Sequence, residues 1–236
     1  MTPHTIIWDF DGTLYPLHPY DSEQSLLRLR LEQLKGPQRC LRHTMIRWLI
    51  HADMQQWFTH GSLRHIYGRL YGWCLKGTPV PLLDRTAEGI AALISLDTRK
   101  ALHRLCANGF RMLVISCGTL DLSERVLMQA GIRECFEAVQ ANPLRIRNNL
   151  ISGVAAHLIT AHDKLRRAKK IVGHRSQGIM AVGDGYTDIP LLDWVEKPVM
   201  IDPGNVKKRQ YPSKPYLFVP SIQSLQKHLL SIYTLL

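Results

Sequence analysis

The 236-residue chain is poor in acidic residues and in cysteine. It carries 19 Asp and Glu against 30 Lys and Arg, which gives a formal net charge of +11. Its five cysteines are odd in number, widely spaced and without a CxxC pair. This pattern argues against a disulfide framework and against a zinc site. We therefore expect a protein of the reducing cytoplasm.

Long apolar runs are also missing. No uninterrupted stretch approaches the ~18–20 residues of a membrane span. The opening MTPHTIIWDF lacks the basic region and apolar stretch of a signal peptide. No RNA-binding motif or zinc finger accompanies the positive charge. The charge is consistent with solvated helix faces and with anionic ligands in general, so a nucleic-acid partner is not indicated, although it stays open.

The chain changes character along its length. From about residue 21 to 76 it predicts helices, and Met45, Leu49 and Ala52 recur there at helical spacing. The stretch KGTPVPLLDRT predicts a turn-rich hinge. From Ser95 onward, apolar runs such as FRMLVIS and GIMAVGD alternate with helical segments. That alternation predicts an α/β fold with a doubly wound parallel sheet.

Polar residues stand where several predicted strands end. Asp9 ends the first apolar run, Ser116 ends the second, and Asp184 follows GIMAVG. Ligands of such sheets lie beyond the carboxyl ends of the strands. Asp11 and Asp188 lie two and four residues further along the chain. Carboxylates that converge in this way repel one another unless a cation sits among them, and all-oxygen ligation suits Mg²⁺.

Small residues accompany these acids. Gly12 allows a sharp turn close to a ligand. After Ser116, the backbone of Cys117 and Gly118 is able to present N–H groups to an anion. Lys164, at the start of a basic helix, is placed to offset the remaining negative charge. The sequence therefore predicts a magnesium and anion site at one edge of the sheet.

The segments DFDGTLY, ISCGT, Lys164 and GDGYTD resemble, in order, the four motifs of the haloacid dehalogenase superfamily phosphatases. The resemblance covers about residues 4–16 and 95–205 and is greatest to the phosphoserine phosphatase branch. It implies a Rossmann-like catalytic core of residues 1–16 and 95–236. It also implies that residues 17–94 are an all-helical cap that closes over the core and selects the substrate.

The resemblance implies a role for each motif residue. Asp9 would be the nucleophile that forms an aspartyl-phosphate. Asp11 would protonate the leaving alcohol and then activate water. Ser116 would bind a phosphoryl oxygen, and Lys164 would neutralise charge on Asp9 and the phosphoryl group.

The resemblance also implies the ligand contacts. Mg²⁺ would be held by Asp9, the backbone carbonyl of Asp11, Asp184 and Asp188, the last directly or through water. The phosphate contacts implied by the motifs are those of Gly12, Ser116, Cys117, Gly118 and Lys164. Cys117 stands where glycine is common, and we expect it to be a small buried thiol and not a nucleophile. In the cap, candidates for substrate contact are Tyr15, Arg47, Arg64 and Arg69.

These expectations predict a Mg²⁺-dependent phosphatase that hydrolyses a small, anionic phosphorylated metabolite. A carboxylated or multiply anionic phosphate would suit the arginines of the cap. A phosphotransferase would keep the same residues, and a phosphatase acting on a nucleotide or a nucleic-acid end is a further alternative. A dehalogenase needs neither a metal nor a second acid, and a binding protein has no use for Asp11, so both readings are disfavoured. The oligomeric state is not readable from the sequence.

Overall fold

The computed structural model describes residues 5–17, 19–34, 39–58 and 61–233, and it is built on one six-stranded, fully parallel sheet. The strand order is β3-β2-β1-β6-β7-β8, so the first strand lies in the interior of the sheet. This confirms the predicted doubly wound parallel sheet. The strands are β1 (Thr5–Trp8), β2 (Arg111–Thr119), β3 (Ala138–Asn142), β6 (Ile179–Gly183), β7 (Lys197–Ile201) and β8 (Leu217–Val219).

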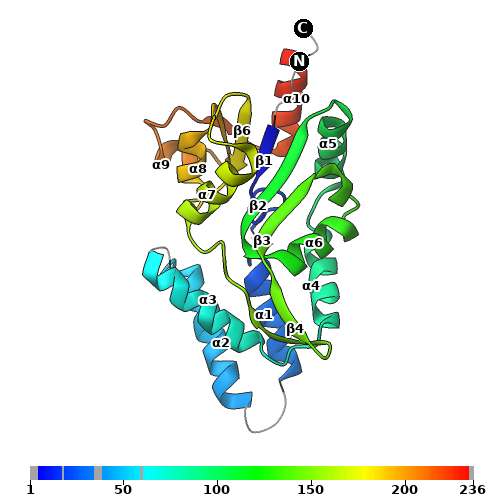
Figure 1. The fold of residues 1–236 in the computed structure, drawn as a ribbon, viewed down its shortest axis with the longest axis vertical. Coiled ribbons are helices and arrows are strands. Elements are labelled where there is room, and N and C mark those ends of the chain that lie inside the picture. Colours follow the sequence, from blue (N-terminus) through cyan, green and yellow to red (C-terminus); the bar gives the residue numbers. More distant parts are fainter. Residues whose placement is uncertain (1–4, 18, 35–38, 59–60, 234–236) are drawn as a thin grey trace.

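The side chains of β1 alternate between two separate cores, as the period of a strand requires. Ile6 and Trp8 belong to the larger core, which also holds buried side chains of α5, α6 and α10. Ile7 belongs to a smaller core on the other face, built with α7 and α8. Helices therefore cover both faces of the sheet (Figure 1). The helices are α5 (Leu96–Ala107), α6 (Leu120–Gln129), α7 (Ala161–Val172), α8 (Ile189–Trp194) and α10 (Ile222–Tyr233).

The segment between β1 and β2 is helical where the structure describes it. It contains α1 (Ser22–Gln33), α2 (Arg39–Met54), α3 (Gly61–Leu75) and α4 (Pro81–Ala91). The first three pack on one another, and α4 packs against both α1 and α6. Figure 1 shows α2 and α3 standing apart from the sheet layer.

A two-stranded hairpin joins these helices from a distant part of the sequence. Strands β4 (Leu144–Arg147) and β5 (Leu150–Val154) are connected through Asn148 and Asn149, both at positive φ. Asparagine tolerates that conformation, which two-residue hairpin turns require. The amide of Gly77, just after α3, donates to the carbonyl of Ile151 in β5. The hairpin is therefore hydrogen-bonded to the segment that follows α3. The sequence analysis did not predict this hairpin.

The prediction of a turn-rich hinge over KGTPVPLLDRT was only partly right. Gly77 does adopt a positive φ of 77°, but helix α4 already begins at Pro81. Proline is favoured at the first helical position because its missing N–H has no partner there in any case. The proline that signalled a break therefore starts a helix.

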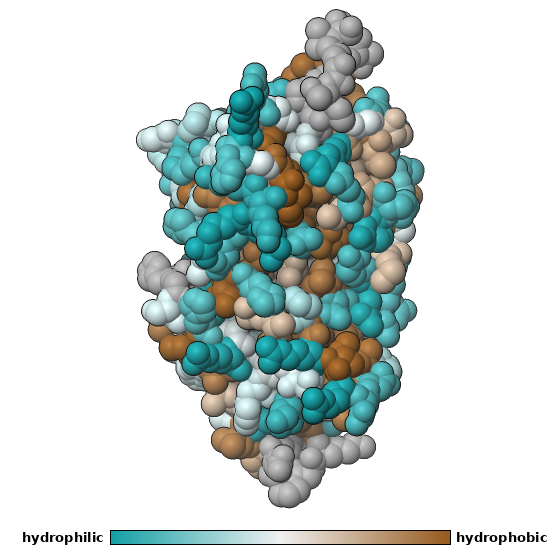
Figure 2. All heavy atoms as spheres, viewed as in Figure 1, coloured by the Kyte–Doolittle hydropathy of each residue, from teal (hydrophilic) through white to brown (hydrophobic). Residues whose placement is uncertain are grey.

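On the face that Figure 2 shows, polar side chains predominate and apolar ones are scattered among them. Within the described part of the chain, none of the helices combines the length and the apolar character needed to cross a bilayer.

Helix α5 offers a matched test of the larger core. Leu105 is fully buried, whereas Leu96 on the same helix is 64% exposed. Leu105→Ala should lower the free energy of unfolding by about 2–5 kcal/mol because it leaves a cavity. Leu96→Ala should change it by less than about 0.5 kcal/mol. Urea denaturation of both variants measures the difference, and equal values would contradict the described packing of α5.

Candidate active site

The site lies where the order of the strands reverses. From β1 the chain continues to β2 on one side, while β6 pairs with β1 on the other side. Asp9 follows β1 and Asp184 follows β6. The amide of Asp9 donates to the carbonyl of Val182 at 2.8 Å, which fixes the two strand ends together. Such a switch point is the usual ligand site of an open parallel sheet.

Lys164 lies at the centre of this site and is completely buried. Its Nζ is 2.5 Å from Oδ1 of Asp9 and 2.5 Å from Oδ1 of Asp188. Thr160 caps α7 and forms a reciprocal capping box with Asp163, which fixes the first turn that carries the lysine. Burial opposes the charge of Lys164, yet Asp188 and Asp9 outweigh it and raise the pKa of the lysine. The ammonium therefore stays charged between two carboxylates.

Asp188 is held on both oxygens. Oδ1 contacts Lys164, while Oδ2 accepts from the amides of Asp184 and Gly185 at 3.1 and 3.0 Å. The position of Gly183 requires a glycine, because a Cβ there would lie 2.4 Å from the Asp188 carboxyl carbon. Asp188 thus organises the loop after β6.

The residues at this edge of the sheet fit a divalent metal. One carboxylate oxygen from each of Asp9, Asp184 and Asp188 lies within 4.8 Å of the other two. Gly12, at a φ of 75°, brings the backbone against Asp184, where a Cβ would lie 2.3 Å from Oδ2. Three carboxylates against the single ammonium of Lys164 leave an excess of negative charge, and their all-oxygen donors match Mg²⁺.

Burial shifts the acids of this edge in the direction expected without a metal. Burial and then the charge of Asp188 raise the pKa of Asp184 to about 7. Burial and Asp188 also raise the pKa of Asp9, and Lys164 opposes that rise. A cation among the three carboxylates would favour their ionised forms.

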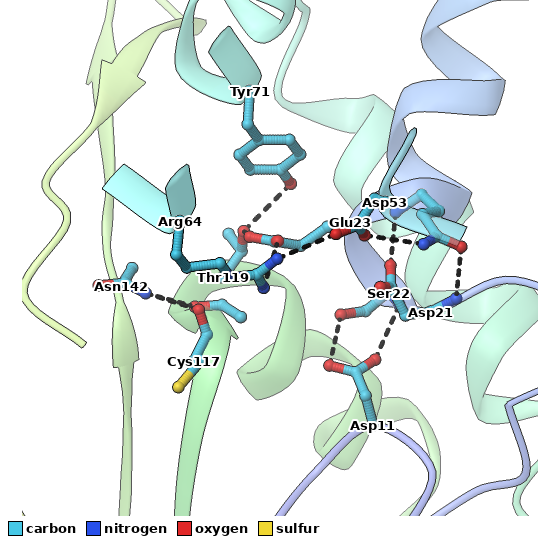
Figure 3. A network of polar contacts seen from close by, with 12 residues as sticks. Asp11, Asp21, Ser22, Glu23, Asp53, Arg64, Tyr71, Cys117, Thr119 and Asn142 are labelled. Atoms are coloured by element: carbon cyan, nitrogen blue, oxygen red, sulfur yellow. Dashed lines mark hydrogen bonds and ion pairs between the residues drawn. The ribbon is translucent and has the colours of Figure 1, made fainter. Parts of the chain in front are cut away.

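Asp11 points away from this edge towards the start of α1 (Figure 3). Its Oδ1 accepts from the hydroxyl of Tyr15 and from the amide of Ser22 at 2.8 Å. Its Oδ2 accepts from the hydroxyl of Ser22 at 3.0 Å. Burial raises the pKa of Asp11, whereas these donors lower it. The second acid of the motif is therefore anchored to the helical segment.

The last residues of β2 form another side of the site. Ser116 is buried, and its Oγ accepts the amide of Gly118 at 3.0 Å. A Cβ at Gly118 would lie 3.3 Å from Oδ2 of Asp11, so the strand end passes close to the second acid. Burial raises the pKa of the Cys117 thiol to about 12, which keeps it protonated and poorly nucleophilic.

Asn142 holds the end of β2 in place, and it was not among the predicted site residues. Its Nδ2 donates to the carbonyls of Cys117 at 2.7 Å and Leu158 at 2.8 Å, and its Oδ1 accepts the amides of His157 and Leu158. It ends β3 just as Asp9 follows the end of β1, whereas Ser116, predicted to end its strand, lies three residues before the end of β2. That shared position was the available signal.

A cavity of about 380 Å³ connects the sheet edge to the helical segment. From the core it is lined by Asp9, Asp11, Ser116, Cys117, Gly118 and Asp184, and from the helical segment by Asp21, Glu23, Gln24, Asp53 and Arg64, among others. Lys164 and Asp188 are buried and do not themselves line the cavity. Of the other cap candidates, Tyr15 contacts Asp11, whereas Arg47 and Arg69 are exposed and do not line the cavity.

Solved structures resemble the whole chain at low sequence identity. A phosphoserine phosphatase with a phospho-aspartyl intermediate analogue superposes with a TM-score of 0.68 and 16% identity, covering 97% of this chain and 99% of its own. A probable phosphoserine phosphatase from Vibrio cholerae gives a TM-score of 0.70 and 17% identity, covering 99% of this chain and 67% of its own. Cytosolic 5′-nucleotidase IIIB bound to cytidine gives 0.64 and 16%, covering 99% and 88%.

These identities establish a shared fold. A comparison with curated protein sequences gives no significant match. The family model of the haloacid dehalogenase-like hydrolases, however, matches residues 6–193. That span covers most of the chain and contains every strand end that meets at Lys164. The chain therefore belongs to the haloacid dehalogenase-like hydrolases.

Proposed function

We propose that the protein is a Mg²⁺-dependent phosphatase that hydrolyses a small phosphomonoester through an aspartyl-phosphate. The observation that carries this proposal is the buried Lys164 ammonium held between Asp9 and Asp188, with Asp184 alongside. The solved neighbours named as phosphoserine phosphatases support the reaction class. The five free cysteines support the cytoplasm as its setting.

In the proposed reaction, Asp9 attacks the phosphorus atom. Its Oδ1 is bound to Lys164, which leaves Oδ2 for the attack. Lys164 spreads its charge over the nucleophile and the incoming phosphoryl oxygens. Asp9, Asp184 and Asp188, with the backbone carbonyl of Asp11, would hold the metal. The bound metal would supply positive charge to the phosphoryl group.

Asp11 carries the proton in both steps of this proposal. Burial raises its pKa, which favours the protonated form that the leaving alcohol requires. The resulting carboxylate is stabilised by Tyr15 and Ser22 and then takes a proton from the water that cleaves the aspartyl-phosphate. Ser116 and the adjoining backbone of Cys117 and Gly118 would bind the phosphoryl oxygens.

We further propose that residues 17–94 act as the cap. Helices α1, α2 and α3 supply the outer lining of the cavity, while α4 anchors the segment on α6 of the core. Because Ser22 of α1 holds Asp11, movement of this segment would also move the proposed general acid. A phosphotransferase would use the same residues, and the choice of acceptor depends on whether water reaches the closed cavity.

The nucleophile assignment predicts that Asp9→Asn lowers kcat towards 4-nitrophenyl phosphate by about 10³-fold or more, because an amide cannot form the intermediate. Phosphate release in the presence of Mg²⁺ measures it. Asp97→Asn, an exposed aspartate on α5, is the matched control and should keep full activity. Full activity of Asp9→Asn would refute the assignment.

The general-acid assignment predicts a defect that depends on the leaving group. Asp11→Asn should lower kcat for an alkyl phosphate by about 10²–10⁴-fold, because the departing alkoxide is strongly basic. The loss should be smaller for 4-nitrophenyl phosphate, whose leaving phenolate needs little protonation in the first step. Equal losses for the two esters would point to a structural defect and not to proton transfer.

The metal assignment predicts that EDTA abolishes activity and that Mg²⁺ restores it. The Asp184 pKa of about 7 lies above that of an ordinary carboxyl, so protons compete with the metal below neutral pH. The Mg²⁺ concentration for half-maximal activity should therefore fall as the pH rises from 6 to 8. If binding displaces one proton, this concentration falls by at most about tenfold for each pH unit. Activity titrations at several pH values test this. A constant requirement would show that Asp184 is already ionised.

A further inference from the structure

The part of the cavity remote from Asp9 is lined by charged side chains of the proposed cap. We call this the cap wall and define it by Asp21, Glu23, Asp53 and Arg64, which all line the cavity. Figure 3 shows these four side chains in one network of polar contacts. Asp21 and Glu23 lie at the start of α1, Asp53 lies at the end of α2, and Arg64 lies on α3. The wall and Asp9 line the same cavity, so a phosphomonoester bound at Asp9 as proposed above extends its leaving group into the space that the wall lines.

Arg64 is already engaged by the wall itself. One terminal nitrogen lies 3.0 Å from Oδ1 of Asp53, and the other lies 3.9 Å from Oε2 of Glu23. The ring of Tyr67 covers the face of its guanidinium, with 4.5 Å between the ring centroid and Cζ. A carboxylate on the substrate would have to displace an acid of the protein to reach this arginine.

The cap wall carries more negative than positive charge. Its three carboxylates face one guanidinium, which leaves a formal charge of −2 at full ionisation. Asp11 accepts from Ser22, which lies between Asp21 and Glu23, so it adds a further carboxylate next to the cap wall. Lys207, from α9 (Val206–Gln210), also lines the cavity, but its charge acts on Asp184 at the metal end. Among the described residues that line the cavity, Arg64 is therefore the one cation that contacts the acids of the cap wall.

Two further observations show that the wall is not electrostatically satisfied. Burial raises the pKa of Glu23 to about 7 despite the opposing charge of Arg64. The hydroxyl of Tyr67 is buried without a hydrogen-bond partner among the described residues. Burial raises the pKa of that hydroxyl, and the charges of Glu23 and Asp53 raise it further, so it faces these acids as a neutral group.

The arrangement does not suit a second metal ion. Within the described residues, the acidic groups tight enough for one ion are Asp9, Asp184 and Asp188, and a separate set of His103, Glu134 and Cys135. The carboxylates of the cap wall are not among them. They are spread around a space that suits a larger cation with several N–H donors.

From these contacts we infer that the leaving group of the substrate is an amino alcohol without a carboxylate, whose ammonium group is bound by Glu23 and Asp21. The inference rests on the proposed phosphatase function and names its substrate class. Phosphate lies over Asp9 and Lys164, and the alkyl chain runs along the cavity towards the cap wall. The arginines of the cap predicted a carboxylated substrate, but Arg64, the arginine that lines the cavity among the described residues, is paired with Asp53 and Glu23.

A matched series of esters tests the inference with Mg²⁺ present. The esters are 2-aminoethyl phosphate, its uncharged counterpart propyl phosphate, carboxymethyl phosphate and O-phosphoserine, with 4-nitrophenyl phosphate as the activity standard. The value of kcat/KM for 2-aminoethyl phosphate should exceed that for propyl phosphate by about 10- to 100-fold, because charged hydrogen bonds contribute that much. Carboxymethyl phosphate should be the poorest substrate.

Two variants locate the effect. Glu23→Gln should abolish the advantage of 2-aminoethyl phosphate over propyl phosphate. Because Glu23 is buried, Asp21→Asn provides a second variant, and asparagine caps a helix as well as aspartate does. Glu88→Gln, an exposed glutamate on α4, is the control and should keep the full preference.

Equal or better turnover of propyl phosphate, carboxymethyl phosphate or O-phosphoserine would overturn the inference, because each would show that the ammonium alone is not what the wall selects. Hydrolysis of 4-nitrophenyl phosphate with such a reversed preference would leave the phosphatase proposal standing. No hydrolysis of any ester, the standard included, would refute the phosphatase proposal and this inference with it.

Discussion

The structure of the site depends on one buried ammonium group. Lys164 contacts Asp9 and Asp188 at 2.5 Å each, and none of its side chain reaches solvent. Removing either partner of such a set leaves a buried charge without compensation, which is strongly destabilising. The three residues come from the ends of β1, α7 and the loop after β6. Their contact therefore requires the strand order β2-β1-β6 to be in place.

Buried hydrogen bonds fix the surroundings of this ion pair. The Thr160 capping box sets the first turn of α7, and Asn142 joins the ends of β2 and β3 to the chain before α7. Glycine at position 183 leaves room for the Asp188 carboxyl. A reacting phosphoryl group needs fixed charges that do not reorganise during the reaction. These supporting residues provide that rigidity on the core side, whereas Asp11 is tied to the helical segment.

Much of this was predictable from the sequence, and the errors have physical causes. Apolar runs alternating with amphipathic segments predicted the parallel sheet, and the carboxylates at the strand ends predicted its ligand edge. The hairpin after Pro143 was missed because its strands are short and largely exposed, so they lack a strong apolar pattern. The predicted turn-rich hinge included residues that belong to α4, because Pro81 was read as a break although it is the first residue of that helix. Asn142 was missed because its role lies in contacts with distant backbone groups.

The sequence by itself determined the family to which the chain belongs. The types and spacing of Asp9, Asp11, Ser116, Lys164 and Asp184 follow the order of the motifs, and the family model matches the span that contains them, residues 6–193. Only the tertiary structure decided the charge that the cavity presents to a leaving group. The sequence shows a basic chain, but Arg64 is neutralised by Asp53 and Glu23 from two other helices. Electrostatics depends on distance in space, and the distances between α1, α2 and α3 are set by packing.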